Sequence, residues 1–130
     1  MLVSAKLKFF LDIEKEFSME QVSYEHFSCV EILAGTVIQV EEFPKARQPA
    51  YKIWVNFGDK VGIKKTSAQV TVRYKPEDLM HKKVMGCVNI GTRNIGGFSS
   101  EFLLLGFLDA KKAIILPNFS DEISDGQKLH

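Results

Sequence analysis

Polar side chains capable of binding a nucleic acid are concentrated in one short segment of this 130-residue chain, residues 64–69. On an extended strand, successive side chains point to opposite faces, so Lys65, Ser67 and Gln69 are expected to share one face. That face would offer a cation, a hydroxyl and an amide in a row. This set suits a sugar-phosphate backbone and exposed base edges, which is where RNA is usually read. The segment therefore predicts a contact with RNA.

Positive charge is concentrated around the same segment. Residues 60–93 hold eight lysines and arginines against two acidic residues, about +6, whereas the whole chain carries +1 and the remainder is near −5. A folded domain that gathers its cations in one region favours polyanions. We predict RNA contacts for eight residues, the cations at phosphates and the others at nucleotides: Lys64, Lys65, Arg73 and Arg93, then Ser67, Gln69, Asn89 and Ser100.

The alternative is that this segment is an ordinary solvated surface. Lysines mostly lie in water, and polar side chains such as Ser67, Gln69 and Asn89 often satisfy backbone groups of turns instead of binding a ligand. Their joint placement in the basic region favours binding. The position of each side chain in the folded chain decides between the two interpretations.

Patterns typical of catalysis or metal binding are absent from the sequence. The three histidines, His26, His81 and His130, are dispersed, and no nucleophile elbow, phosphate loop or histidine–carboxylate pattern occurs. Ser100 and Glu101 are adjacent, but on a strand they would point to opposite faces. The sequence predicts a protein that is not an enzyme and that needs no metal and no cofactor.

The cysteines and the hydropathy pattern bear on the cellular compartment. Cys29 and Cys87 lack metal-ligand spacing and have apolar neighbours, which is typical of reduced cysteines in a cytoplasmic protein. No segment reaches the roughly 18 apolar residues that cross a bilayer. Residues 1–17 contain acidic side chains and no small-residue cleavage site, unlike a signal peptide. We predict a cytoplasmic location without membrane insertion.

The elements that must position these side chains are mostly strands. The alternating or apolar pattern of strands occurs over residues 30–43, 51–57, 63–69, 83–89, 98–108 and 113–116. Gly35 marks the place where the first strand is expected to bend or bulge. Residues 44–49 are expected to form a loop, because a proline lies at each end. Pro76, followed by two acidic residues, predicts the start of a short helix.

This element order predicts an all-β fold. Short strands, with one short helix between the third and the fourth, are typical of a five-stranded Greek-key barrel of the OB type. A β-sandwich is the alternative, because periodicity alone does not exclude it. Residues 5–17 carry apolar side chains at helical spacing, which predicts an amphipathic helix. We therefore divide the chain into a helical N-terminal extension, residues 1–18, and an OB-fold domain, residues 19–130.

Several consecutive motifs resemble those of the CsaA family. They lie at residues 43–52 (FPKARQPAYK), 57–59, 63–71, 74–79, 89–101 (ending GFSSE) and 103–106. The resemblance covers roughly residues 24–129. CsaA proteins are similar to free-standing tRNA-binding domains and to the domains appended to some methionyl- and phenylalanyl-tRNA synthetases.

The resemblance implies an OB-fold barrel, a homodimer and structure-directed binding of tRNA without catalysis. Two positions depart from the family pattern. Leu33 stands where family members usually carry arginine, which removes one phosphate contact. Gly91 and Thr92 replace a proline pair, which gives a more flexible loop before Arg93. The function predicted is a dimeric tRNA-binding protein.

A second function follows from the same resemblance and from the apolar residues. Some family members are described as secretion-related chaperones that bind unfolded polypeptide, so unfolded or pre-secretory polypeptides are the alternative partners. The chain has aromatic side chains for such contacts at Phe43, Trp54, Phe98, Phe102 and Phe107. Most of them are expected in the core or in a dimer interface.

Overall fold

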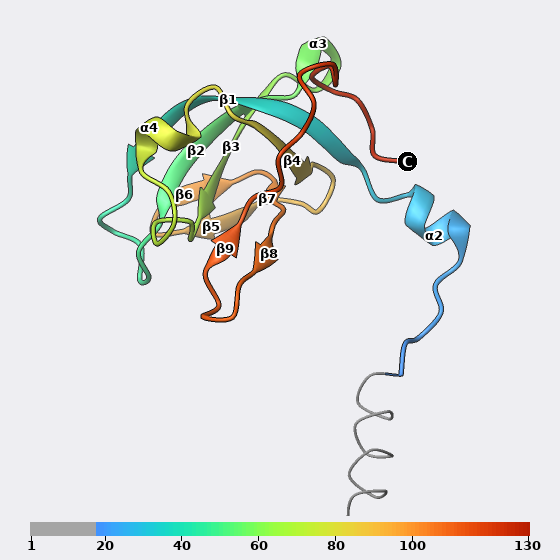
Figure 1. Ribbon diagram of the computed structural model, residues 1–130, viewed down its shortest axis with the longest axis horizontal. Coiled ribbons are helices and arrows are strands. Elements are labelled where there is room, and N and C mark those ends of the chain that lie inside the picture. The colour runs from blue at the N-terminus through green and yellow to red at the C-terminus, as the bar shows by residue number, and fades with distance from the viewer. Residues whose placement is uncertain (1–17) are drawn as a thin grey trace, which may run out of the picture.

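The main sheet contains five strands, in the order β3 (Ile63–Ala68), β2 (Tyr51–Asn56), β1 (Ile32–Glu42), β4 (Lys83–Cys87) and β7 (Leu103–Leu104). Every neighbouring pair is antiparallel. The computed structural model describes residues 18–130, so the helix predicted over residues 5–17 lies outside the described residues. The sheet curls strongly, with β1 running along its top (Figure 1).

The sheet becomes a nearly closed barrel where β3 meets the chain just before β7. The Glu101 amide donates to the Lys65 carbonyl at 2.8 Å, and the Lys65 amide donates back to the Glu101 carboxylate at 3.0 Å. The Thr66 hydroxyl donates to the Phe102 carbonyl at 2.6 Å. These bonds join the two edges of the curled sheet, which confirms the predicted OB-like barrel.

The remaining elements are short: α2 (Tyr24–Ser28), α3 (Gly58–Val61), α4 (Pro76–Leu79), β5 (Arg93–Ile95), β6 (Phe98–Ser100), β8 (Phe107–Leu108) and β9 (Ile114–Ile115). Helix α4 begins at Pro76, as predicted, and the Asp78 carboxylate accepts from the Lys75 amide at 2.8 Å. None of the helices in residues 18–130 is long and apolar enough to cross a membrane.

The single strand predicted over residues 98–108 is wrong. The chain forms three short strands there, because it changes pairing partner twice. Strand β6 pairs with β5, β7 pairs with β4, and β8 pairs with β9. The first of these pairings makes the β5–β6 hairpin.

The alternation of buried and half-buried side chains along β2 shows which of them face the core. In β2, Tyr51, Ile53 and Val55 are buried, and the residues between them are half-buried, as the period of two predicts. The barrel interior also contains Phe57 and Phe102, whose rings pack edge to face with centroids 4.9 Å apart. The outward-facing residues of β2 are therefore available to form a surface on the outside of the barrel.

Gly35 serves packing and does not form the bulge predicted there. The register of β1 against β2 shifts instead between Val37 and Gln39. A Cβ atom on Gly35 would lie 2.5 Å from a Val55 methyl carbon and 2.8 Å from the Phe57 ring. Because such contacts are too short for real Cβ atoms, Gly35 lets the side chains of Val55 and Phe57 approach the strand.

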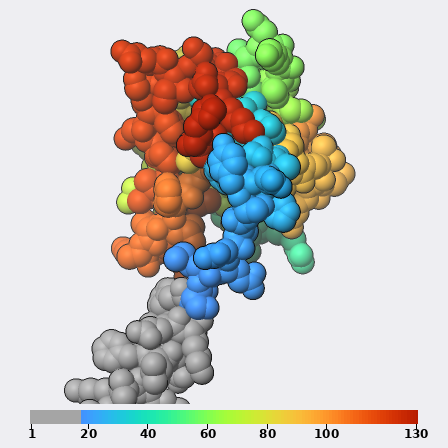
Figure 2. Space-filling model, turned by 90° about the vertical axis from the view of Figure 1, so that its right-hand side faces the viewer, coloured from blue at the N-terminus to red at the C-terminus, as the bar shows by residue number. Residues whose placement is uncertain are grey.

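The C-terminal segment pairs with the start of β1, on the edge that β2 leaves uncovered. The Ala34 amide donates to the Gln127 carbonyl at 2.9 Å, and the Leu129 amide donates to the Ile32 carbonyl at 2.8 Å. The Lys128 ammonium reaches the Ser28 carbonyl at 2.8 Å. The last residues therefore lie against the segment that leads into the barrel (Figure 2).

Candidate nucleic-acid interface

An open groove of about 640 Å³ lies between the loop after β1 and the β5–β6 hairpin. We call it the basic groove. It is lined by Lys45, Ala46, Arg47, Gln48 and Ala50 of the loop, Ser67 and Gln69 of β3 and its end, and Arg93, Asn94, Ile95 and Gly96 of the hairpin. Of the residues that the structure describes, no acidic one lines this groove. Its chemistry suits an anionic ligand with hydrogen-bonding edges.

A second pocket of about 360 Å³ continues the basic groove along the hairpin. Ser67, Arg93 and Ile95 line both hollows. The second pocket adds the loop of residues 90–92 and Ser100. The polar surface therefore extends from the first loop, across β3, to the loop before β5.

Backbone restrictions explain the shape of the first wall of the groove. The chain leaves β1 at the buried Phe43, and Pro44 and Pro49 lack the amide hydrogens needed to extend the ladder. The Ala46 amide donates to the Phe43 carbonyl at 3.2 Å, which folds the loop back on itself. The loop therefore leaves the sheet and projects its exposed Arg47 from the barrel.

The second wall is the β5–β6 hairpin. Arg93 pairs with Ser100 and Ile95 pairs with Phe98, so the turn between them contains only Gly96 and Gly97. Both glycines have positive φ, 57° and 81°. Two-residue hairpin turns favour positive φ because it matches the twist of the paired strands. This geometry holds the exposed Arg93 at a fixed place beside β3.

Strand β3 places Ser67 and Lys65 on its outer face, as the sequence predicted. Thr66 and Ala68, on the opposite face, are buried, while Lys65 and Ser67 are half-buried. The Lys65 ammonium lies 5.0 Å from the centroid of the Phe98 ring. Lys64 shares the face of Thr66 and so does not point with Ser67. The structure therefore brings Ser67, Gln69 and Arg93 together, keeps Lys65 beside the hairpin, and separates Lys64.

Arg73 is paired within the protein. Its guanidinium donates to the Asp109 carboxylate at 3.1 Å, and this pair joins the turn after β3 to the β8–β9 hairpin. The amide of Ala113 and then the Arg73 side chain, with the Lys111 amide, hold the pKa of Asp109 below its ordinary value. Arg73 therefore has an anionic partner already, whereas none of the ion pairs within residues 18–130 involves a cation that lines the groove.

Asn89 and Ser100 make internal hydrogen bonds. The Asn89 side chain accepts from the Glu31 amide at 2.9 Å and donates to the Cys29 carbonyl at 2.7 Å. The buried Ser100 hydroxyl lies 2.7 Å from that of Thr66 and accepts from the Ser67 amide at 3.1 Å. Ser100 lines the pocket that continues the groove, Asn89 lines neither hollow, and both side chains are engaged in hydrogen bonds within the protein.

Lys82 and Lys83, which belong to the basic segment of the sequence, do not line the groove. The Lys82 ammonium donates to the Asn118 side chain at 2.8 Å, and the Lys83 ammonium reaches the Asp125 carboxylate at 3.2 Å. The groove instead recruits Lys45 and Arg47, which lie outside that segment and were missed. Two cations within a proline-bounded loop were the indication that could have identified them.

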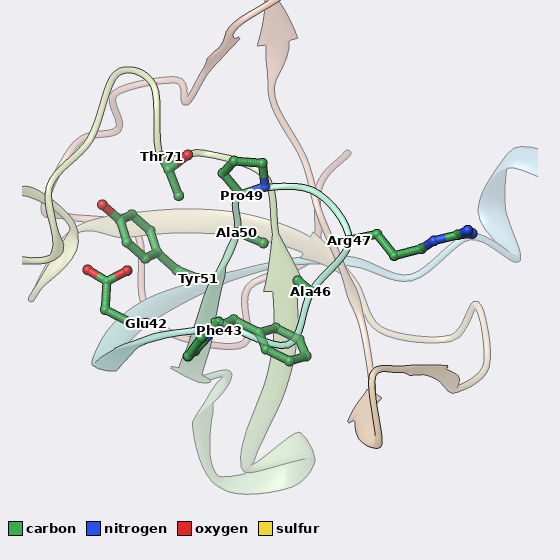
Figure 3. Close-up of a pocket in the computed structure, with 9 residues that line it drawn as sticks. Glu42, Phe43, Ala46, Arg47, Pro49, Ala50, Tyr51 and Thr71 are labelled. Atoms are coloured by element: carbon green, nitrogen blue, oxygen red, sulfur yellow. The ribbon is translucent and has the colours of Figure 1, made fainter.

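A further pocket of about 400 Å³ lies on the side of the loop facing Tyr51. Figure 3 shows Arg47 reaching away from this pocket and the carboxylate of Glu42 beside it. The Tyr51 hydroxyl donates to the Tyr74 carbonyl at 2.9 Å. Burial, followed by the charge of Glu42, raises the pKa of Tyr51, which keeps it a neutral donor. Glu42 and Arg47 both line this pocket, so it combines opposite charges, whereas no acidic residue among those described lines the basic groove.

Comparisons with known proteins point to nucleic acid as well. A family described as "Putative tRNA binding domain" matches residues 32–128. The structure of the CsaA chaperone protein from Picrophilus torridus is 35% identical, with a TM-score of 0.78, over 85% of this chain and 100% of that one. The structure of the chaperone CsaA from Bacillus anthracis is also 35% identical, with a TM-score of 0.79 and the same coverage.

Methionine–tRNA ligases share a stretch of the same sequence. The ligase of Pyrococcus furiosus is 30% identical over 115 residues, which is 88% of this chain and 15% of the ligase. The ligase of Methanocaldococcus jannaschii is 28% identical over 111 residues, 85% of this chain and 17% of the ligase. This chain thus spans less than a fifth of the length of these relatives.

Proposed function

Since this chain belongs to the family of putative tRNA-binding domains and is CsaA-like within it, we propose that it is a non-catalytic tRNA-binding protein. The observation that carries the proposal is the basic groove. In this groove, three cations lie beside the polar side chains of β3 and its end. They come from two segments far apart in the sequence, the loop after β1 and the β5–β6 hairpin. Because tRNA is the proposed partner, we also propose the cytoplasm as its location.

Each kind of side chain in the groove has a role in binding. Lys45, Arg47 and Arg93 neutralise phosphates, and arginine does so with a planar fork that matches two phosphate oxygens. Ser67 and Gln69 form hydrogen bonds with ribose hydroxyls and base edges. Contacts to phosphate alone do not distinguish these groups. Binding by this mechanism orders and positions the RNA, and no bond of the RNA is made or broken.

The salt dependence of binding follows from the number of cations. If Lys65 joins the three groove cations, four phosphates are neutralised. The affinity for tRNA is then expected to fall about 50- to 150-fold between about 50 and 200 mM salt. Filter binding of total tRNA to the full chain across a salt titration measures this slope.

The residue assignment is tested by the pair Lys65→Ala with Arg93→Ala. This double variant is expected to weaken tRNA binding and to flatten the logarithmic salt slope by about 1.4–1.8. The control is Lys60→Ala with Lys111→Ala, which removes the same charge from two exposed positions that do not line the groove. Equal losses in both double variants, or no loss in either, would show that the groove does not bind tRNA.

We further propose that the protein is a homodimer, as the CsaA resemblance implies. Two basic grooves acting on one folded RNA would raise the avidity without any new contact. Apolar side chains suited to an interface are exposed on the β8–β9 hairpin, where Phe107 and Leu108 are 66% and 64% accessible. This hairpin projects from the barrel in Figure 1. Sedimentation of the full chain at micromolar concentration decides the point, and a monomer would contradict it.

A second candidate function is binding of unfolded or pre-secretory polypeptides. The exposed apolar residues favour it, and the two solved structures that are 35% identical are both described as CsaA chaperones. Such a chaperone would suppress aggregation of an unfolded client at high salt and would ignore the groove substitutions. The aggregation assay with the groove variants separates the candidates, and unfolded peptide added as a competitor to the tRNA assay shows whether both ligands share one surface.

A further inference from the structure

The ammonium of Lys52, on the outer face of β2, lies against two aromatic rings that pack on each other. This ammonium is 4.9 Å from the centroid of the Phe43 ring and 5.1 Å from that of the Phe98 ring. The rings pack edge to face with their centroids 5.5 Å apart, and they are only 5% and 9% accessible. Trp54 packs edge-on against Phe98 at 5.9 Å. A cation near a ring face is attracted by the ring quadrupole.

The two rings belong to the two walls of the basic groove. Phe43 precedes the loop that carries Lys45 and Arg47, and Phe98 lies on β6, next to the turn of the hairpin that carries Arg93. The walls also approach each other directly. A Cβ atom on Gly96 would lie 3.2 Å from the Lys45 carbonyl oxygen and 3.3 Å from the Phe43 ring. Whatever holds Phe43 to Phe98 therefore sets the separation of the walls.

We propose that Lys52 is a positioning residue for RNA binding, because its ammonium clamps Phe43 to Phe98 and so fixes the width of the basic groove. The effect of Lys52 on RNA binding rests on the proposed function. Lys52 itself does not line the groove. Lys52 acts through the two rings. The phosphates themselves are bound by Lys45, Arg47 and Arg93.

Lys65 provides the natural comparison. Its ammonium lies 5.0 Å from the Phe98 centroid, close to the distance of Lys52 from the same ring. Among the contacts within residues 18–130, however, the ammonium of Lys65 faces only the hairpin ring, whereas that of Lys52 faces both. Removing Lys65 takes away a cation without opening the clamp. Removing Lys52 takes away an ammonium that faces both rings, so the loop and the hairpin are held less tightly, by their direct packing.

The clamp is tested in the free protein by hydrogen exchange of the full chain. The variant Lys52→Met keeps the length of the side chain and removes the ammonium. It is expected to speed exchange about tenfold at two reporter amides, Ala46 in the loop and Gly97 in the hairpin. Each reporter donates one local hydrogen bond, to Phe43 and to Asn94. Lys65→Met should leave the Ala46 rate unchanged, and Lys52→Arg should restore both rates, since arginine also stacks on rings.

Binding of total tRNA gives the second measurement. Lys52→Met is expected to weaken binding while the salt slope stays that of the parent, because no phosphate contact is lost. Lys65→Met should flatten the slope by about 0.7–0.9, the value for one phosphate. A flattened slope for Lys52→Met would overturn the proposal, because it would mean that Lys52 binds phosphate itself. Unchanged exchange at Ala46 and Gly97 would overturn it as well.

Two further results keep the test decisive. If Lys52→Met does not fold, Phe43→Leu removes one ring of the clamp at similar volume, and faster exchange at Gly97 is again required. If the parent chain binds no tRNA, the proposed function fails, and the exchange rates of the free protein still decide whether Lys52 holds the two walls together.

Discussion

The basic groove and the C-terminal segment both contain lysine or arginine side chains, and they use them differently. Near the C-terminus, Lys83 and Lys128 make ion pairs with Asp125 and Glu31, at 3.2 and 3.0 Å, and each also binds a backbone carbonyl. In the part of the chain that the structure describes, no ion pair involves the cations that line the groove.

The difference teaches that a count of charges along the sequence does not locate a binding surface. Lys83 belongs to the most basic stretch of the sequence, yet it fastens the C-terminal segment to β4. Arg47 belongs to no such stretch, yet it is exposed in the groove. We therefore expect the groove cations to govern RNA binding and the paired cations to govern stability.

Charge reversal in the groove should give the largest effect. Arg47→Glu with Arg93→Glu is expected to lower tRNA affinity at least about 1,000-fold at about 50 mM salt, since each lost phosphate contact costs about tenfold and the new charges repel RNA. The melting temperature should stay that of the parent. Filter binding and thermal unfolding measure the two quantities. The matched control, Lys60→Glu with Lys111→Glu, should keep most of the affinity.

Lys83→Met should show the opposite behaviour. Its side chain is only 17% accessible, and its ammonium binds Asp125 and the Ile123 carbonyl. Removing it is expected to cost about 1–3 kcal/mol of unfolding free energy, because two charge-assisted bonds are lost and, within residues 18–130, the Asp125 carboxylate is left with its bond from Thr36. Urea unfolding measures the loss. A flattened salt slope of tRNA binding in this variant would break the comparison.

Ser100→Ala separates the role predicted for this residue from the one that the structure supports. The substitution removes the hydrogen bonds of Ser100 to Thr66 and to the Ser67 amide. It is expected to lower the unfolding free energy by about 1–2 kcal/mol, and to leave the salt slope unchanged. A large loss of tRNA affinity with unchanged stability would instead support the predicted contact with nucleotides.

The smallest effect is expected at the exposed pair of Arg73 and Asp109. The folded protein lowers the pKa of Asp109, so this carboxylate contributes stability above its unfolded pKa, and the contribution is lost as the pH falls through the folded pKa. Asp109→Asn should therefore melt slightly below the parent at pH 7. The two melting curves should converge as the pH is lowered from 7 through the folded pKa of Asp109. A constant difference across this range would contradict the assignment.

Local patterns predicted the strands because their period is local. Strict alternation placed the second strand at residues 51–57, and the structure has it at Tyr51–Asn56. The same period placed Lys65 and Ser67 on one face of β3, which the burial pattern of that strand confirms. The number and the lengths of the strands favoured one small barrel. The sheet topology and the similar solved structure confirm this predicted OB-like fold.

Long-range contacts limited the prediction of the site. Asn89 is tied to Glu31, 58 residues away, and Ser100 is tied to Thr66, 34 residues away. No local pattern shows that these polar groups are already satisfied. The groove likewise exists only because closure of the barrel brings the loop of Arg47 to the hairpin of Arg93.

The most direct test of the account is to map, residue by residue, where tRNA touches the protein. Backbone amide signals of the full chain would be followed by NMR while total tRNA is added. We expect changes concentrated at residues 45–48, 67–69 and 93–96, with little change at residues 123–129. Changes centred on the C-terminal segment or on the β8–β9 hairpin, with the groove unaffected, would contradict the claim that the groove binds RNA.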